Sequence, residues 1–481
     1  MKHGKSPGTD GFVAEFFKFF WKELGPLIVR SLNEAFRDGE LSSTQKEGLI
    51  TCVPKEDKPK EYLKNWRPIS LLNVIYKIGS SCIANRLKNV LPQLINEDQT
   101  GFMTNRYIGD NIRLIYDLMN YLNSKNMPGL LLSLDFEKAF DSLDWDFMFK
   151  VLQAFNFGQD LCKWVRTFYT DIKSSIIVNG QCTKWFSVKR GCRQGDPISP
   201  YLFLLSVEIL ATMIRENENI VGISMNNTDL KISQFADDAQ MFTNGDKKSF
   251  EVTIETINKF STVSGLYLNN QKTKAIWLGS KKHCNTQYMS HLEFEWNPQK
   301  FKILGIWFTQ NIKDCIKLNY SEKLYEIKVL IKIWLRRIIT PLGRVAVLKS
   351  LILSKLTHLW ILLPNPPQEY MEELQKMCFQ FVWNKKQDRI SRKTVVKQVK
   401  KGGLGIPELK SFASALKLMW IRKLKNSEHK WKNICLTMFP CLKYFEYYDS
   451  EIVAHKDLKE NSFWQQVMTA YGQLVMLKNR P

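Results

Sequence analysis

The sequence lacks the cysteine patterns that cross-link secreted domains or bind structural zinc. Its ten cysteines are scattered singly, with no Cys-x-x-Cys pair and no Cys/His cluster at zinc-ligand spacing. The polar N-terminus is not a signal peptide, and the longest apolar run, Tyr201–Ile214, contains Glu208 and is too short to span a bilayer. These absences predict free thiols and an intracellular protein, in the nucleus or cytoplasm, that is neither secreted nor bound to a membrane.

Acidic residues are too few to balance the basic ones. The chain has 69 Lys and Arg against 47 Asp and Glu, a formal net charge of +22. Such an excess repels itself unless a polyanion relieves it, so nucleic acid is the leading partner, although a ribosomal or membrane-surface protein could be as basic. With 481 residues, 44% apolar and 12% aromatic, the chain is long enough for several packed subdomains and is not a disordered basic tail.

One stretch places two adjacent carboxylates at the tip of a predicted β-hairpin. β-prone residues flank Phe235-Ala236-Asp237-Asp238 on both sides, and the apolar run 130–134 ends on Asp135, as a buried central strand would. If Asp135 lies beside the tip, three carboxylates converge on one sheet edge, and such oxygen ligands suit Mg²⁺ or Mn²⁺. An Asp-Asp pair alone is usually only a solvated turn, so its sequence context decides the interpretation.

Four further segments surround this hairpin in a fixed order. They are Asp135-Phe136-Glu137-Lys138-Ala139-Phe140-Asp141, the loop 191–200 that contains Gln194-Gly195-Asp196-Pro197, then 265–273 and Phe301-Lys302-Ile303-Leu304-Gly305-Ile306. The series resembles the palm motifs of reverse transcriptases, in the order of that family. The variant Phe-Ala-Asp-Asp, with Arg67-Pro68-Ile69-Ser70-Leu71 upstream, is similar to the non-LTR (LINE-type) retrotransposon branch.

The resemblance implies an α+β right-hand polymerase with fingers, a palm built on an antiparallel sheet, and a helical thumb. The expected divisions are an N-terminal extension at 1–37, a reverse transcriptase domain at 38–309 (fingers about 38–126, palm about 127–309), a basic thumb at 320–400 and a C-terminal helical segment of unknown role at 401–481. Residues 321–410 hold 18 Lys and Arg against 7 Asp and Glu, as a region that grips a duplex would. A fold that begins this close to residue 1 suggests a piece of a longer polyprotein, and no segment resembles the endonuclease that usually precedes this enzyme in LINE-type elements.

Several local structures are also expected. The N-terminal helix with Phe12, Phe16, Phe19, Phe20 and Leu24 should pack in a core and break at Gly25-Pro26. Alternating strands and helices predict a palm sheet with helices on one face. Asp141 and Asp144 are expected to start helices, and residues 402–407 to form a linker to the last segment.

The resemblance assigns the chemistry of nucleotidyl transfer to particular residues. Asp135, Asp237 and Asp238 are the catalytic metal ligands for two Mg²⁺ (or Mn²⁺) ions, which promote attack of a primer 3′-hydroxyl on an α-phosphate. The expected partners are an RNA template, a DNA primer and deoxynucleoside triphosphates, and the oligomeric state stays open.

Other residues are assigned to the nucleotide and the primer. Lys55 and Arg67 flank a fingers loop and would clamp the triphosphate, which needs cationic neutralisation. The remaining nucleotide-binding candidates are Phe136, Phe140, Gln194, Gly195 and Lys272, the last as proton donor to pyrophosphate, and the primer grip contains Leu304 and Gly305.

Two rival functions compete with reverse transcription. An RNA-dependent RNA polymerase could use the same palm, but Phe140, five residues after Asp135, would crowd a ribose 2′-hydroxyl. A catalytically inactive, truncated retroelement remnant could bind nucleic acid only, although the intact acidic residues count against it.

Overall fold

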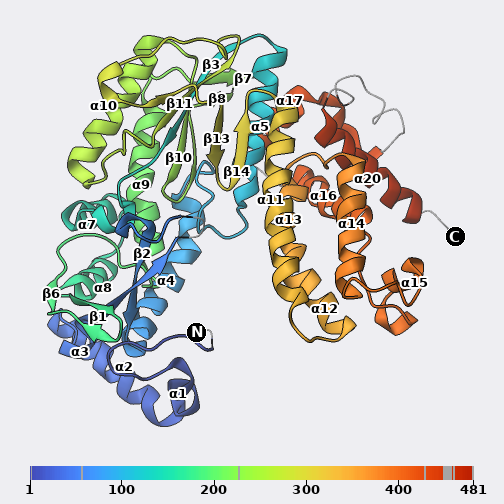
Figure 1. Ribbon diagram of the computed structural model, residues 1–481. Coiled ribbons are helices and arrows are strands. Elements are labelled where there is room, and N and C mark those ends of the chain that lie inside the picture. Colours follow the sequence, from blue (N-terminus) through green and yellow to red (C-terminus); the bar gives the residue numbers. More distant parts are fainter. Residues whose placement is uncertain are drawn as a thin grey trace.

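The computed structural model of the protein describes residues 1, 3–55, 58–225, 228–426, 430–447, 458 and 461–478. Two sheets, each with its own helices, lie on one side of the molecule, and a helical region lies on the other (Figure 1). The observed mixture of helices and largely antiparallel sheets is the predicted α+β class.

The N-terminal extension consists of α1 (Ala14–Phe19) and α2 (Trp21–Asp38). The expected break at Gly25-Pro26 is wrong, because α2 continues through both residues while Ile28 and Leu32 pack in a small core with Phe17. Tertiary packing therefore outweighs the helix-breaking tendency of proline at this site. The predicted core role is also wrong for part of the aromatic stripe, since Phe19 is 81% exposed.

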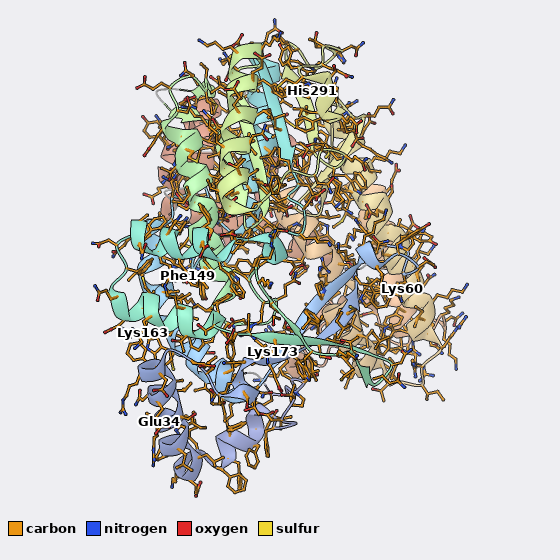
Figure 2. The ribbon with its side chains drawn as sticks, turned by 90° about the vertical axis from the view of Figure 1, so that its left-hand side faces the viewer. Glu34, Lys60, Phe149, Lys163, Lys173 and His291 are labelled. Atoms are coloured by element: carbon orange, nitrogen blue, oxygen red, sulfur yellow. The ribbon has the colours of Figure 1, made fainter. Side chains whose placement is uncertain are left out.

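The fingers sheet joins strands that lie far apart in the sequence. Its order is β2-β1-β4-β5, with β6 also paired to β4. The strands are β1 (Glu47–Pro54), β2 (Trp66–Leu72), β4 (Lys173–Val178), β5 (Gln181–Cys182) and β6 (Phe186–Ser187). Because β4 runs parallel to β1, residues from within the predicted palm range belong to the fingers sheet. The loop of the β1–β2 hairpin, marked by Lys60, extends away from the N-terminal helices, marked by Glu34 (Figure 2).

The palm sheet has the order β12-β11-β3-β10-β9, and its central strand is the apolar run expected from the sequence. The strands are β3 (Pro128–Leu134), β9 (Ile232–Phe235), β10 (Asp238–Thr243), β11 (Lys274–Gly279) and β12 (Glu295–Trp296). Leu130 and Leu132 pack into the core with α7 (Trp145–Ala154), α9 (Ser199–Glu216) and α10 (Lys247–Ser264). Leu131 instead packs with α5 (Ile108–Ser124), so helices cover both faces and not one (Figure 1).

Further elements complete these two regions. They are α3 (Ser43–Lys46), η1 (Leu63–Asn65), α4 (Val74–Leu94), α6 (Ala139–Ser142), α8 (Gln159–Tyr169), β7 (Ile223–Met225), β8 (Thr228–Leu230), η2 (Ser290–Leu292), β13 (Lys300–Ile303) and β14 (Ile306–Thr309).

The thumb and C-terminal segment are helical. They comprise α11 (Ile312–Leu335), α12 (Pro341–Val347), η3 (Leu348–Ile352), α13 (Ser354–Leu362), α14 (Gln368–Val382), α15 (Arg392–Val396), η4 (Val399–Lys401), α16 (Leu409–Asn426), α17 (Lys430–Met438), η5 (Pro440–Tyr447) and α20 (Ser462–Lys478). The expected linker at 402–407 is wrong, because Ile406 is buried and the Leu404 amide donates to the Val395 carbonyl (3.0 Å). Among the described helices, no single one is long and apolar enough to cross a membrane. One bent pair, Pro341–Ile352 with Ser354–Leu362, would be, judged by length and composition alone.

Buried charges join the C-terminal segment to α5, which lies within the range predicted for the fingers but packs on the palm sheet. Arg113 forms a buried ion pair with Asp117, and its guanidinium lies 3.9 Å from the centre of the Phe463 ring. The Trp464 indole donates to Asp117 (3.3 Å), and the Lys423 ammonium donates to both oxygens of Asp110 (2.8 Å each). The described residues from 401 onward therefore contribute to the thumb–palm core and are not an appendage.

Candidate active site

The three predicted aspartates meet at one edge of the palm sheet. Strands β3 and β10 are antiparallel with Leu134 opposite Ala239, so Asp135 and Asp238 are the next pair along this register. Phe235 pairs with Asp238 across β9 and β10, which leaves Ala236 and Asp237 as the turn. Asp237 and Asp238 are exposed, and Asp135 is half-buried. The sequence prediction of this convergence is therefore matched by the register of the strands.

The charges at this edge repel one another. Burial is the largest cause that raises the pKa of Asp238, to about 7, and the negative charges of Asp237 and Asp135 raise it further. Burial and Asp135 also raise the pKa of Asp237, whereas Arg67 lowers it. Although solvent reaches both side chains, the surrounding protein removes enough water to penalise their charged forms. A bound cation would relieve this penalty.

Gln99, to which the sequence assigns no individual role, supports the turn formed by Ala236 and Asp237. Its side-chain oxygen accepts hydrogen bonds from the amides of Ala236 and Gly101 (both 2.8 Å), and its amide nitrogen donates to the Ala236 carbonyl (3.3 Å). Ala236 has φ 55°, a left-handed conformation that is unfavourable for a residue with a side chain. Gly101 also approaches so closely that a Cβ there would lie 2.4 Å from the Ala236 nitrogen. No local sequence signal indicates this role, because Gln99 contacts a residue 137 positions away in the chain.

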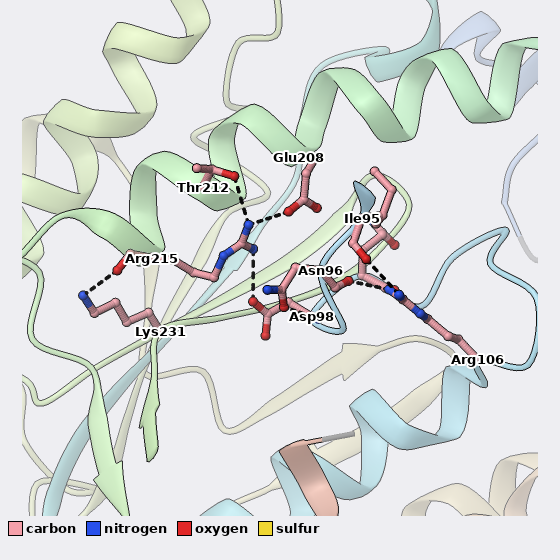
Figure 3. Close-up of polar contacts among 9 residues, drawn as sticks. Ile95, Asn96, Asp98, Arg106, Glu208, Thr212, Arg215 and Lys231 are labelled. Atoms are coloured by element: carbon pink, nitrogen blue, oxygen red, sulfur yellow. Dashed lines mark hydrogen bonds and ion pairs between the residues drawn. The ribbon is translucent and has the colours of Figure 1, made fainter. Parts of the chain in front are cut away.

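The loop that carries Gln99 is fixed to the palm by charged side chains. Arg215 of α9 contacts the carboxylates of Glu208 and Asp98, the latter at 3.1 Å (Figure 3). Arg106 donates to the Gln99 carbonyl at 2.7 Å. The Gln234 amide of β9 donates to the Asp98 carbonyl (2.7 Å), which extends the sheet to this loop. These contacts hold the segment against β9, where its Gln99 supports the turn that carries Asp237.

Basic residues gather beside the carboxylates. The Lys272 ammonium lies 3.1 Å from Asp135 Oδ2, and the segment before it is held alongside because the Asn269 amide donates to the Asp135 carbonyl (2.7 Å). Burial lowers the pKa of Lys55, and the nearby positive charges of Lys58, Lys272 and Arg67 lower it further. Lys55, Arg67 and Lys272 therefore lie in one field of positive charge next to the acidic edge.

The predicted nucleotide-contacting loop lies against the fingers. Gly195 has φ 114°, and a Cβ there would meet the Ser70 carbonyl oxygen at 2.6 Å, so only glycine fits without strain. The Ser70 amide in turn donates to the Gln194 carbonyl (2.7 Å). The Gln194 side-chain amide donates to Asp141 (3.3 Å), so Asp141 is more than a helix-start residue, whereas Asp144 caps α7 as expected.

Of the two aromatic candidates, only Phe140 reaches the surface. Its half-buried ring stacks on Phe203 with centroids 4.3 Å apart, while Phe136 is 7% exposed and packs in the palm core. The predicted primer grip is the turn between β13 and β14, where Leu304 and Gly305 have φ 49° and 84°. The Leu304 carbonyl lies 3.4 Å from His358 Nε2 on α13, which links this turn to the thumb.

Comparison with known families agrees with this geometry. The family described as reverse transcriptase (RNA-dependent DNA polymerase) matches residues 53–308, more than half of the chain. The chain belongs to the reverse transcriptase family. This match favours DNA synthesis over the rival RNA-dependent RNA polymerase.

Curated relatives of this reverse transcriptase come from transposable elements. The chain is 30% identical over 427 residues to a transposon TX1 uncharacterized 149 kDa protein of Xenopus laevis, covering 88% of this chain and 32% of that protein. It is 25% identical over 443 residues to the Pol polyprotein of the type-2 retrotransposable element R2DM of Drosophila melanogaster, covering 89% of this chain and 40% of that protein. The resemblance to non-LTR retrotransposon enzymes is confirmed, and the chain spans about a third of the length of these relatives.

Solved structures resemble the chain more distantly. Telomerase from Candida Tropicalis in complex with a TWJ fragment of telomeric RNA is 13% identical, with a TM-score of 0.43, covering 87% of this chain and 67% of that one. A likeness of this degree carries no argument. The right-hand polymerase fold of this reverse transcriptase instead follows from its own fingers and palm sheets, its helical thumb and its family.

The donor set at the palm edge fits the divalent metal on which reverse transcriptases generally depend. Carboxylate oxygens are the ligands that Mg²⁺ and Mn²⁺ prefer, and Asp135 Oδ2 is a buried atom that accepts no hydrogen bond, although it is ion-paired with Lys272. Within the described part of the chain, no three His, Cys, Asp or Glu residues are already arranged as a metal cluster. The aspartates therefore have the right chemistry, and ion binding would have to draw them together and displace Lys272 from Asp135.

Proposed function

We propose that this chain is the polymerase part of a non-LTR retrotransposon polyprotein, which extends a DNA primer along an RNA template inside the cell. The observation that carries the proposal is the register of β3 and β10, which pairs Leu134 with Ala239, so that Asp135 and Asp238 are the next residues along it and Asp237 lies in the adjoining turn. This arrangement brings three carboxylates to one edge of a sheet beside a cluster of basic residues. The singly placed cysteines support an intracellular site of action.

In the proposed reaction, Asp135 and Asp237 would hold two Mg²⁺ or Mn²⁺ ions, with Asp238 as a third ligand. The ions, when bound, supply activation of the primer 3′-hydroxyl and neutralisation of the charge that develops on the phosphates. Gln99 keeps Ala236 in its left-handed turn and so orients the two carboxylates that follow. Lys55 and Arg67 neutralise the triphosphate from the fingers side.

Other residues of the chain would orient the substrates. Lys272, which is ion-paired with Asp135, would give a proton to the departing pyrophosphate once it is released. Gln194, held by Asp141, and Gly195 would lie against the new base pair, and Phe140 would oppose a ribose 2′-hydroxyl. Leu304 and Gly305 would contact the primer strand, and α11 and its neighbours in the thumb would contact the duplex.

The test is primer extension by the purified chain on an RNA template annealed to a DNA primer. We expect Asp237→Asn to reduce the single-turnover rate by about a thousandfold or more, because it removes an anionic ligand from the metal site. Asp146→Asn is the matched control, since Asp146 is exposed in the first turn of α7, outside the site. Wild-type extension with an equally active Asp237→Asn variant would reject the site, and a wild type that binds but never extends the primer would favour an inactive remnant.

A further inference from the structure

A dense group of basic residues lies beyond α14, apart from the proposed reaction. Residues 384–401, here called the basic knob, contain eight Lys or Arg residues and one acid, Asp388. All eight basic side chains are exposed, and they are Lys385, Lys386, Arg389, Arg392, Lys393, Lys397, Lys400 and Lys401. These 18 residues therefore carry about a third of the net charge of the whole chain.

The basic knob has a compact fold and is anchored in the thumb. Val395 is fully buried in the thumb core, and its carbonyl accepts from the Leu404 amide (3.0 Å). The Gly405 amide donates to the Lys397 carbonyl (2.8 Å). Gly403 also lies against this carbonyl, so closely that a Cβ on Gly403 would be 2.0 Å from its oxygen. The charged side chains are therefore displayed from a fixed backbone, which lowers the entropy lost when they bind a ligand.

The basic knob lies on the side of the thumb away from the palm. In Figure 1, α11 and α13 stand between the palm sheet and α14, and α15 lies beyond α14 at the outer edge. Helix α11 contacts β14, whereas the knob packs on α14, where Arg392 lies over the Phe379 ring at 4.9 Å. A primer–template helix held between the palm and α11 would therefore not lie against this surface, so the basic excess of 321–410 is divided between two faces.

The charges of the basic knob are mostly uncompensated by protein. Arg392 pairs with Asp388 (2.8 Å), and within the described residues the other seven basic side chains form no ion pair. Their mutual repulsion disfavours the folded state unless a polyanion is present. The segment contains no aromatic residue. Because single strands are bound largely by stacking bases on aromatic rings, this composition favours contacts with the phosphates of a double helix.

We infer that the basic knob is a second nucleic-acid-binding surface, which holds a double-helical segment other than the primer–template helix in the active site. Phosphates of duplex DNA and of a base-paired RNA stem present the same chemistry to it. Such a surface would let the enzyme keep hold of a second duplex while it copies the template.

The experiment uses the full chain already loaded with a short RNA template and DNA primer. Lys393→Gln, Lys397→Gln and Lys400→Gln are combined in one variant. The matched control combines Lys150→Gln, Lys248→Gln and Lys259→Gln, which removes the same charge from exposed positions on palm helices α7 and α10. Binding of a labelled 25-base-pair DNA duplex, and separately of an RNA duplex of the same length, is measured across a salt series, together with primer extension and the melting temperature.

We expect the knob variant to bind the second duplex at least tenfold more weakly and to lower the slope of log affinity against log salt by about 2–3, because each lost phosphate contact contributes about 0.9. Extension of the short primer and the melting temperature should stay at wild-type values. The duplex that binds with higher affinity shows whether the basic knob holds DNA or a base-paired RNA stem. Equal binding by the knob and control variants, no binding of either duplex by the loaded wild type, or a parallel loss of extension in the knob variant would each overturn the proposal. Failure of wild-type extension alone would instead count against the proposed polymerase function.

Discussion

Two groups of acidic residues, one on α5 and one at the edge of the palm sheet, differ in how their negative charges are compensated. On α5, Asp110 and Asp117 are buried, and each meets a basic side chain, Lys423 or Arg113. At the sheet edge, Asp135, Asp237 and Asp238 lie beside one another, and only Asp135 has an ion pair in the described structure, with Lys272. The α5 group is compensated by the protein itself, whereas the edge group is left with excess negative charge.

The difference separates a structural from a functional use of carboxylates. Burial raises the pKa of Asp117 even though Arg113 lowers it, so this pair depends on both partners being present. Burial and like charges together raise the pKa of Asp238 to about 7, which marks a place where a cation would be stabilised. Removing one carboxylate from the α5 group should therefore destabilise the folded protein. Removing one from the edge group should reduce the repulsion between the remaining carboxylates.

The largest effect on stability is expected from Asp117→Ala. This change leaves the fully buried Arg113 guanidinium without its counter-charge, and we expect a loss of about 3–5 kcal/mol in the free energy of unfolding, measured by denaturant titration. Asp237→Asn should cost less than about 1 kcal/mol in the same assay, since Asp237 is solvent-exposed. Similar losses in both variants would break the distinction between the two groups.

An intermediate effect is expected from Gln99→Leu, which removes the support of the edge group. The change leaves the buried amides of Ala236 and Gly101 without their acceptor, at a cost of about 1–3 kcal/mol. Because the turn can then relax, kcat for extension should fall at least tenfold while KM for the primer–template stays near the wild-type value.

Gln99→Glu sharpens this test, since it retains an acceptor for both amides and should recover part of kcat. A purely structural role for Gln99 would lower stability in Gln99→Leu without this change in kcat.

The smallest effect is expected from substitution of Phe140, which, like the α5 acids, packs in the interior and, like the edge acids, reaches the surface of the site. Its ring packs on Phe203 but is only half-buried, so Phe140→Val should lower stability modestly. If Phe140 is a steric gate, Phe140→Val should incorporate ribonucleotides about tenfold more readily relative to deoxynucleotides. This corresponds to a change of about 1.4 kcal/mol in the difference between the two activation free energies. An equal loss of both activities together with a lower melting temperature would identify Phe140 as a core residue and not a gate.

Local patterns predicted much of the palm. The apolar run ending at Asp135 predicts a central strand, and the residues around Asp237-Asp238 predict a tight turn. Both are present, although the turn itself is Ala236-Asp237 and Asp238 begins β10. The pairing of β4 with β1 could not be foreseen, because a parallel contact between residues 47–51 and 173–177 has no short-range signal. The domain boundaries within the chain stay predictions.

Long-range packing accounts for what the sequence concealed. Helix α2 continues through Pro26 because its apolar face is buried, which no local propensity indicates. Gln99 and Asp141 act through contacts with residues 137 and 53 positions away, so their roles emerged only from the fold. Likewise Arg113 and Trp464, which are far apart in the chain, explain why the C-terminal segment belongs to the core.

The most direct test of the account is Mn²⁺ binding to the purified protein, followed by electron paramagnetic resonance of the free ion. The wild type and the exposed control Asp146→Asn should bind Mn²⁺ at pH 8, and Asp237→Asn should bind it at least tenfold more weakly. Because the pKa of Asp238 is about 7, protonation at pH 6 should weaken binding to the wild type, since a neutral carboxyl is a poor ligand. Mn²⁺ binding of equal strength in all three proteins would contradict a metal site at the edge of the palm sheet.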